Sequence, residues 1–98
     1  MTHFKWLNSN GVESERGFIV QSIGRFEIEY RQGGRRLVVD VETGWLSETK
    51  SCVIITSNAF ERWTGDPASK VIPVDMQQEM LRNFTEAMEF QGIGVVTA

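Results

Sequence analysis

The chain has 98 residues, of which 41% are hydrophobic and 23% are charged, and its formal net charge is −3 with a pI near 5.1. This composition is typical of one folded domain with a single modest core, so residues 1–98 are treated as one domain and a disordered chain is excluded. The negative charge weighs against general nucleic-acid binding, which depends on Lys and Arg contacts to phosphates.

Neither a membrane segment nor a disulfide is expected. No apolar run approaches the roughly 18 residues of a transmembrane helix, and the N-terminal residues lack the apolar core and cleavage site of a signal peptide. We therefore expect a cytoplasmic protein. The single cysteine, Cys52, excludes an internal disulfide and a multi-cysteine metal cluster, and its apolar setting predicts a buried small residue.

The N-terminal third is expected to contribute two strands. Residues 4–7 predict a short edge strand followed by a polar loop, and the only histidine, His3, is expected at the surface. Residues 17–23 predict a second strand, and Gly24 predicts a tight turn after it.

Residues 25–42 are predicted to form a β-hairpin around Gly33 and Gly34. Apolar and charged residues alternate on both sides of this glycine pair, and two glycines can adopt the positive φ of a two-residue hairpin turn. The resulting register forms an apolar face from three cross-strand pairs: Tyr30 with Leu37, Ile28 with Val39, and Phe26 with Val41.

The opposite face of the hairpin is predicted to bring like charges together. Arg31 lies across from Arg36 in this register, and an acidic patch consists of a cross-strand pair and two diagonal neighbours: Glu27, Asp40, Glu29 and Glu42. Like charges directly opposite one another cost roughly 0.2–1 kcal/mol per pair. Either the acidic patch meets a basic partner, or this is a solvated outer face with screened charges.

The middle of the chain contains two tryptophans, each of which is expected either in the core, the favoured interpretation, or at a contact surface. Residues 43–50 predict a loop in which Trp45 either folds under to cap the core, the favoured interpretation, or anchors a partner. Residues 51–56 predict a strand near a sheet centre, because apolar residues occupy successive positions. A capped helical turn is then expected to place Phe60 and Trp63 on one face. Trp63 is expected either to plug the end of the core, the favoured interpretation, or to contact a partner.

After this turn, Gly65-Asp66-Pro67 is expected to begin a loop, and Pro73 predicts an extended segment before the clearest helix. The helix is predicted from Met76 to about Gln91, with Asp75 as N-cap, Gln78 completing a capping box and Gly92 as the stop. Its expected apolar stripe is Met80, Leu81, Phe84, Ala87 and Met88. Its expected outward residues are Gln78, Glu79, Arg82, Asn83, Glu86 and Glu89.

The predicted fold class is α+β: an antiparallel meander of about four strands with one C-terminal amphipathic helix packed across one face. Residues 93–97 are expected to add a short final edge strand. The charged face of the hairpin is expected to point away from the helix.

Recognisable catalytic motifs are missing from the sequence. It contains no GxSxG, no HExxH and no phosphate-binding glycine loop, so we expect no enzyme activity, no catalytic residue and no cofactor. A minor hypothesis is that the four carboxylates of the acidic patch collect a hard cation such as magnesium or calcium.

Three segments together resemble a family of small bacterial immunity proteins: the hairpin E-Y-R…R-R-L-V-V-D-V-E, F-E-R-W-T-G-D-P (Phe60–Pro67), and E-M-L-R-N-F-T-E-A-M-E-F-Q-G (Glu79–Gly92). The resemblance covers roughly residues 17 to 98. Such proteins accompany polymorphic toxins and contact-dependent growth inhibition systems. The resemblance implies a non-catalytic inhibitor that binds the toxin domain of a cognate effector, often a nuclease, and blocks its active site or substrate surface.

Contact residues are nominated from residue chemistry, since the family places none at matching positions. Glu27, Glu29, Asp40 and Glu42 are expected to speed encounter with a basic toxin domain, and Trp45 is expected to hold the complex. Two alternatives stay open. One is a single-stranded nucleic-acid binder that uses Arg31, Arg35 and Arg36 at the hairpin tip; the other is a non-catalytic subunit of a larger complex.

Overall fold

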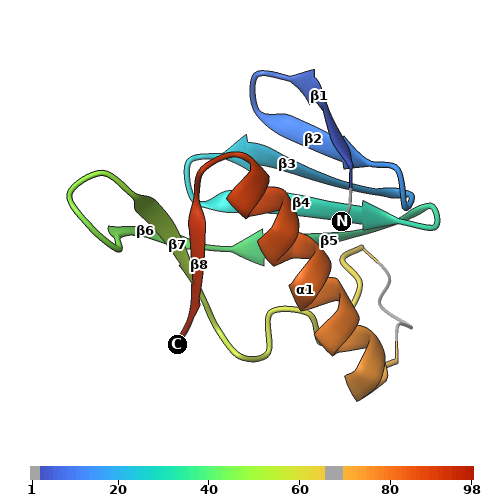
Figure 1. The fold of residues 1–98 in the computed structure, drawn as a ribbon. Helices are drawn as coiled ribbons and strands as arrows, with labels where there is room; N and C mark the ends of the chain where they lie inside the picture. Colours follow the sequence, from blue (N-terminus) through green and yellow to red (C-terminus); the bar gives the residue numbers. More distant parts are fainter. Residues whose placement is uncertain (1–2, 66–69) are drawn as a thin grey trace.

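The fold consists of two sheets and one helix in a computed structural model that describes residues 3–65 and 70–98 (Figure 1). The elements are β1 (Phe4–Asn8), β2 (Gly11–Ser14), β3 (Phe18–Gly24), β4 (Glu27–Gln32), β5 (Arg35–Asp40), β6 (Glu42–Trp45), β7 (Ser51–Ile55), α1 (Val74–Phe90) and β8 (Gly94–Thr97). Strands β1 to β5 form an antiparallel meander in chain order, and β6-β7-β8 form a second sheet. The α+β class, the meander, the C-terminal helix and the final edge strand are confirmed.

The central hairpin has the predicted register. Tyr30 pairs with Leu37 and Ile28 with Val39, and φ is +61° at Gly33 and +77° at Gly34, so the turn needs glycine at both positions. The prediction was wrong for Phe26, whose side chain is 51% exposed. The β4–β5 ladder ends at the Glu27–Asp40 pair, and Phe26 lies in the β3–β4 turn, where its carbonyl accepts the Val41 N–H at 2.9 Å.

The five-stranded sheet is larger than predicted because residues 11–14 are a strand and not a loop. Gly11 makes this pairing possible, since a Cβ there would lie 2.9 Å from the side chain of Gln21 on β3. The short β2 contains only one apolar residue, Val12, which is fully buried. Alternation over four residues with one apolar side chain gives too weak a pattern to predict a strand.

The second sheet begins where the chain leaves β5. After the buried Val41 the chain continues as β6, which pairs antiparallel with β7, and β8 pairs parallel with the other edge of β7 (Figure 1). Strand β7 is thus central, as its continuous apolar sequence predicted. The expected loop at residues 43–50 is wrong in its first part, because Thr43, Gly44 and Trp45 pair with β7.

Helix α1 starts earlier than predicted and without a side-chain cap. Pro73 is the N-cap, with ψ of 143°, and Asp75 lies inside the first turn, so the predicted capping box is wrong. Proline supplies a φ of −52°, which is compatible with helix entry. The predicted stop is confirmed: Gly92 has φ +81°, and the N–H groups of Gly92 and Ile93 donate to the carbonyls of Glu89 and Met88 as in a Schellman motif.

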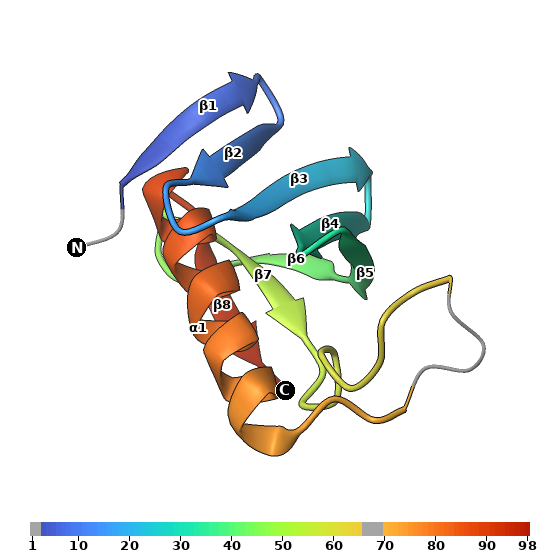
Figure 2. The same ribbon diagram turned by 90° about the vertical axis from the view of Figure 1, so that its right-hand side faces the viewer.

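The core lies between α1 and the inner faces of the two sheets (Figure 2). Aromatic rings form a continuous path through it, with centroid separations of 5.7 Å for Phe18–Tyr30, 5.9 Å for Tyr30–Phe60 and 5.6 Å for Phe60–Phe84. Trp63 is 7% exposed and plugs the core as predicted, although residues 57–60 form turns and not a helix. Asp66 and Pro67 of the expected loop lie outside the described residues.

One polar side chain of the helix was placed on the wrong face. Asn83 was expected to point outward but is 1% exposed, and its Nδ2 donates to the Tyr30 hydroxyl at 3.0 Å. The Tyr30 hydroxyl in turn donates to Gln32 Oε1 at 2.7 Å. Burial raises the pKa of Tyr30, an effect that the Asn83 hydrogen bond opposes. Within the described part of the chain, no helix is long and apolar enough to cross a bilayer.

Candidate functional site

The acidic surface, which we define as Glu27, Asp40 and Glu42, lies on the side of the fold away from α1. Glu27 and Asp40 are directly opposite each other and both are exposed. Their strand neighbours Ile28 and Val39 point into the core, so the carboxylates point outward. Glu42 follows Asp40 by two residues across the buried Val41, and the two residues line the same groove. The structure thus has Glu27 and Asp40 opposed on the bare face, with Glu42 at the start of the second sheet.

Glu29 shares this face but is already engaged. Its side chain is 14% exposed, its Oε2 accepts from Arg36 Nε at 2.8 Å, and its Oε1 lies 3.6 Å from Arg31 Nε. One carboxylate thus bridges the two arginines that the register places opposite each other. Because its carboxylate offsets the repulsion between Arg31 and Arg36, Glu29 stabilises the sheet and is less available to a partner.

The acidic pair has no comparable compensation. Within residues 3–65 and 70–98, the carboxylates of Glu27, Asp40 and Glu42 make no ion pair and no side-chain hydrogen bond. The same sheet therefore holds one like-charge pair that is bridged and one that is not. The unbridged pair is the feature of this face that the stability of the free chain does not explain.

Trp45 is the most exposed of the large apolar side chains in the described residues, at 72%. The favoured prediction, in which it caps the core, is wrong, because Trp45, the last residue of β6, is exposed to solvent. Trp45 and Glu42 are three apart on one strand and so point to opposite faces. Since β6 is an edge strand of its sheet, a single partner bound at this edge can contact both Trp45 and Glu42.

A groove of about 230 Å³ opens beside the acidic surface, at the junction of the two sheets. It brings together the end of β5, the start of β6, the end of β7 and the last residue of the chain as given. Its lining is mostly apolar and consists of Asp40, Val41, Glu42, Ile54, Ile55, Thr56 and Ala98. Sequence reasoning missed this groove because its walls are contributed by segments that are distant in the chain, and no local pattern marks them.

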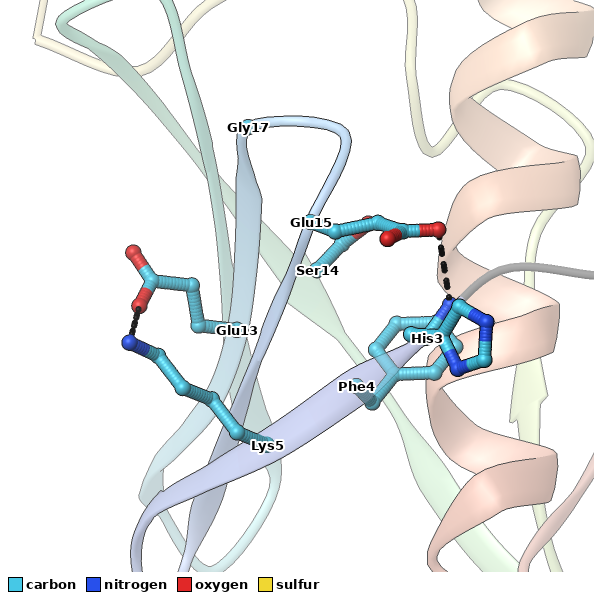
Figure 3. A pocket seen from close by; sticks show the side chains of 7 residues that line it. All are labelled: His3, Phe4, Lys5, Glu13, Ser14, Glu15 and Gly17. Atoms are coloured by element: carbon cyan, nitrogen blue, oxygen red, sulfur yellow. Dashed lines mark hydrogen bonds and ion pairs between the residues drawn. The ribbon is translucent and has the colours of Figure 1, made fainter.

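A larger groove of about 460 Å³ lies between β1 and the turn that joins β2 to β3 (Figure 3). Its charged groups are engaged in holding β1 in place. Lys5 Nζ lies 3.2 Å from Glu13 Oε1, and Glu15 Oε1 accepts the His3 backbone N–H at 3.3 Å. The His3 side chain is exposed, as predicted. These contacts hold β1 against β2 at the sheet edge, so the charged groups of this groove have a structural role.

Metal binding has no support from side-chain placement. The described residues hold no group of three or more His, Cys, Asp or Glu side chains that could bind a metal ion. The four carboxylates of the predicted acidic patch therefore do not form the cation site that was considered for them. Cys52 is buried in β7, as its apolar setting predicted.

The arginines of the hairpin tip are engaged within the chain. Arg31 and Arg36 contact Glu29, and the Arg35 guanidinium lies 5.9 Å from the ring centroid of Trp63. Cation–π contact of this kind holds a guanidinium over an aromatic face. A partner that uses these arginines has to compete with the internal contacts.

Comparison of the chain with known protein families, with curated proteins and with solved structures found no match.

Proposed function

We propose that this chain is a non-catalytic binding protein that neutralises a basic toxin domain by covering its active site or substrate surface. A nuclease is the favoured toxin class, because its substrate groove has to be basic to hold phosphates. The observation that carries the proposal is the uncompensated pair of Glu27 and Asp40 on an open sheet face. The resemblance to immunity proteins supports a toxin as the partner.

The acidic pair favours a partner because of its contrast with the arginine pair. Selection for stability alone favours opposite charges at directly opposed positions of an antiparallel sheet. Glu29 resolves the repulsion between Arg31 and Arg36, but no side chain of the described residues does so for Glu27 and Asp40. A basic surface docked on this face would remove the repulsion, steer association and fix the register of the complex.

Trp45 supplies the apolar part of the proposed contact. An exposed indole buries a large area when a partner covers it, and tryptophan is enriched among the residues that dominate binding energy. We therefore assign long-range attraction to Glu27, Asp40 and Glu42, and retention of the complex to Trp45. In this proposal the protein acts in the cytoplasm of the cell that makes the toxin.

The alternative of single-stranded nucleic-acid binding has weaker support. Its three candidate arginines are held by Glu29 and Trp63, and the formal net charge of −3 opposes phosphate binding. The alternative of a constitutive subunit uses the same surface, and it differs in predicting a partner that is unrelated to any toxin.

The proposal predicts a toxin-domain gene beside the gene of this chain, and co-expression with that toxin domain tests it. The unaltered chain should permit survival and co-purify with the toxin domain, whereas Glu27→Lys/Asp40→Lys should do neither. Glu48→Lys/Glu61→Lys is the matched control, because it changes the net charge equally, away from the acidic surface, and should protect fully. Full protection by Glu27→Lys/Asp40→Lys would remove the acidic surface from the function.

A further inference from the structure

We propose that the groove at the junction of the two sheets receives one arginine side chain of the partner. This inference rests on the proposed function, since it names the kind of side chain that the acidic surface holds. It adds a defined binding site to what would otherwise be a diffuse electrostatic contact.

The groove combines an apolar floor with two carboxylates on the same side. Asp40 and Glu42 flank Val41, which is buried, so both carboxylates point outward beside the groove. Ile54 and Ile55 contribute apolar wall from β7. Long cationic side chains pack their methylene stem on apolar surface and keep the charged head at a polar rim.

Three other polar groups around the groove already have hydrogen-bond partners. The Ala98 N–H donates to the Ile55 carbonyl at 2.8 Å, and the Val41 N–H donates to the Phe26 carbonyl at 2.9 Å. The Thr56 hydroxyl donates to Asn58 Oδ1 at 2.6 Å. What the groove offers an incoming group is therefore apolar contact and carboxylate acceptors, and this combination selects a cation with an apolar stem.

The size of the groove selects a side chain over a small-molecule ligand. Its volume of about 230 Å³ lies below the roughly 300–1,000 Å³ that is usual for small-molecule sites. A hard metal ion is disfavoured because two carboxylates give too few ligands, and the described residues supply no group of three. Arginine fits better than lysine, since a weakly hydrated guanidinium can bond two carboxylates through its several donors.

Titration of isotope-labelled protein with N-acetyl-arginine-methylamide, followed by amide chemical shifts, tests the inference. Saturable shifts should cluster at Val41, Ile54 and Ala98. The citrulline analogue, which has the same shape without the charge, should bind at least about tenfold more weakly. Asp40→Asn/Glu42→Gln should abolish saturation while Glu48→Gln/Glu61→Gln leaves it intact. Scattered shifts, or equal binding of the citrulline analogue, would overturn the inference.

The two proposals fail separately, because the proposed function is measured by protection from the toxin and the groove inference by binding of the arginine probe to the unaltered chain. If Glu27→Lys/Asp40→Lys abolishes protection from the toxin but the arginine probe does not bind, the groove inference is wrong and the proposed function stands. If the probe binds at the groove but Glu27→Lys/Asp40→Lys protects fully, the proposed function is wrong.

Discussion

Replacing Glu27 by lysine should make the free protein more stable, because it converts a repulsive cross-strand pair into an attractive one. Glu27 lies directly opposite Asp40, and neither has another charged partner in the described part of the chain. Relief of the repulsion and the new attraction are each worth about 0.2–1 kcal/mol. Since both side chains are exposed, solvent reduces the sum, and we expect a gain of about 0.5–1 kcal/mol.

The gain can be measured by urea unfolding at low ionic strength, monitored by tryptophan fluorescence. For a domain of this size, a gain of about 0.5–1 kcal/mol corresponds to a rise in Tm of roughly 2–8 °C. Asp40→Lys should give a similar gain, and the double variant should return close to the starting stability because it restores a like-charge pair. The gain should shrink at about 1 M salt, where the Debye length is about 3 Å.

The control for these measurements is Glu48→Lys, which alters an exposed loop residue and should change the free energy of unfolding by no more than about 0.5 kcal/mol. The reasoning is refuted if both single variants are no more stable than the unaltered chain at low salt. It is also refuted if their gain is the same at low and high salt, since a Coulombic origin requires screening.

Three other predictions concern the core, the helix end and a buried hydroxyl. Trp63→Ala should cost about 3–5 kcal/mol of unfolding free energy, whereas Trp45→Ala should change it by less than about 0.5 kcal/mol; similar costs in urea unfolding would contradict the assigned burial of 7% and 72%. Gly92→Ala should cost about 1–2 kcal/mol of unfolding free energy, because φ is +81° at this position. No steric clash adds to this cost, since no atom of the described residues beyond its chain neighbours lies within 4 Å of the new Cβ. An unchanged Tm would show that the helix end relaxes freely. Tyr30 should titrate above its ordinary pKa of 10.0, because the ring is buried. The protein should therefore lose stability as the pH rises beyond 10.0, and Tyr30→Phe should lack this loss. Tyrosinate absorbance that titrates at or below 10.0 would contradict the prediction.

Local rules were sufficient to predict the central hairpin and the end of the helix. The register around Gly33 and Gly34 follows from turn length and alternation, which are both local, and it fixed the positions of Glu27 and Asp40. The stop at Gly92 likewise depends on one residue that tolerates positive φ. A turn or a helix end that depends on only a few neighbouring residues can therefore be predicted from the sequence.

The errors arose where distant segments decide the structure. Strand β6 forms because β7 pairs with it, and its own sequence, Glu42 to Trp45, has no apolar alternation. The helix begins at Val74 and not at Met76, because Pro73, and not Asp75, occupies the N-cap position. Asn83 is buried and donates to the Tyr30 hydroxyl across the core, a contact with a distant strand that helical periodicity does not reveal.

The candidate site was predictable in part. The placement of Glu27 and Asp40 on the bare face follows from the hairpin register. The engagement of Glu29 by two arginines was not predicted, because it depends on side-chain conformation across the sheet. The exposure of Trp45 was also missed, because it depends on where the second sheet ends.

The association rate of the protein with the proposed toxin domain, measured against ionic strength, tests the central claim most directly. The unaltered chain should associate rapidly at low salt, with a rate constant that falls steeply as salt rises. Glu27→Lys/Asp40→Lys should associate at least about tenfold more slowly at low salt and show little salt dependence, while Glu48→Lys/Glu61→Lys should follow the unaltered chain more closely. Equal rates and equal salt dependence for all three proteins would contradict docking through the acidic surface.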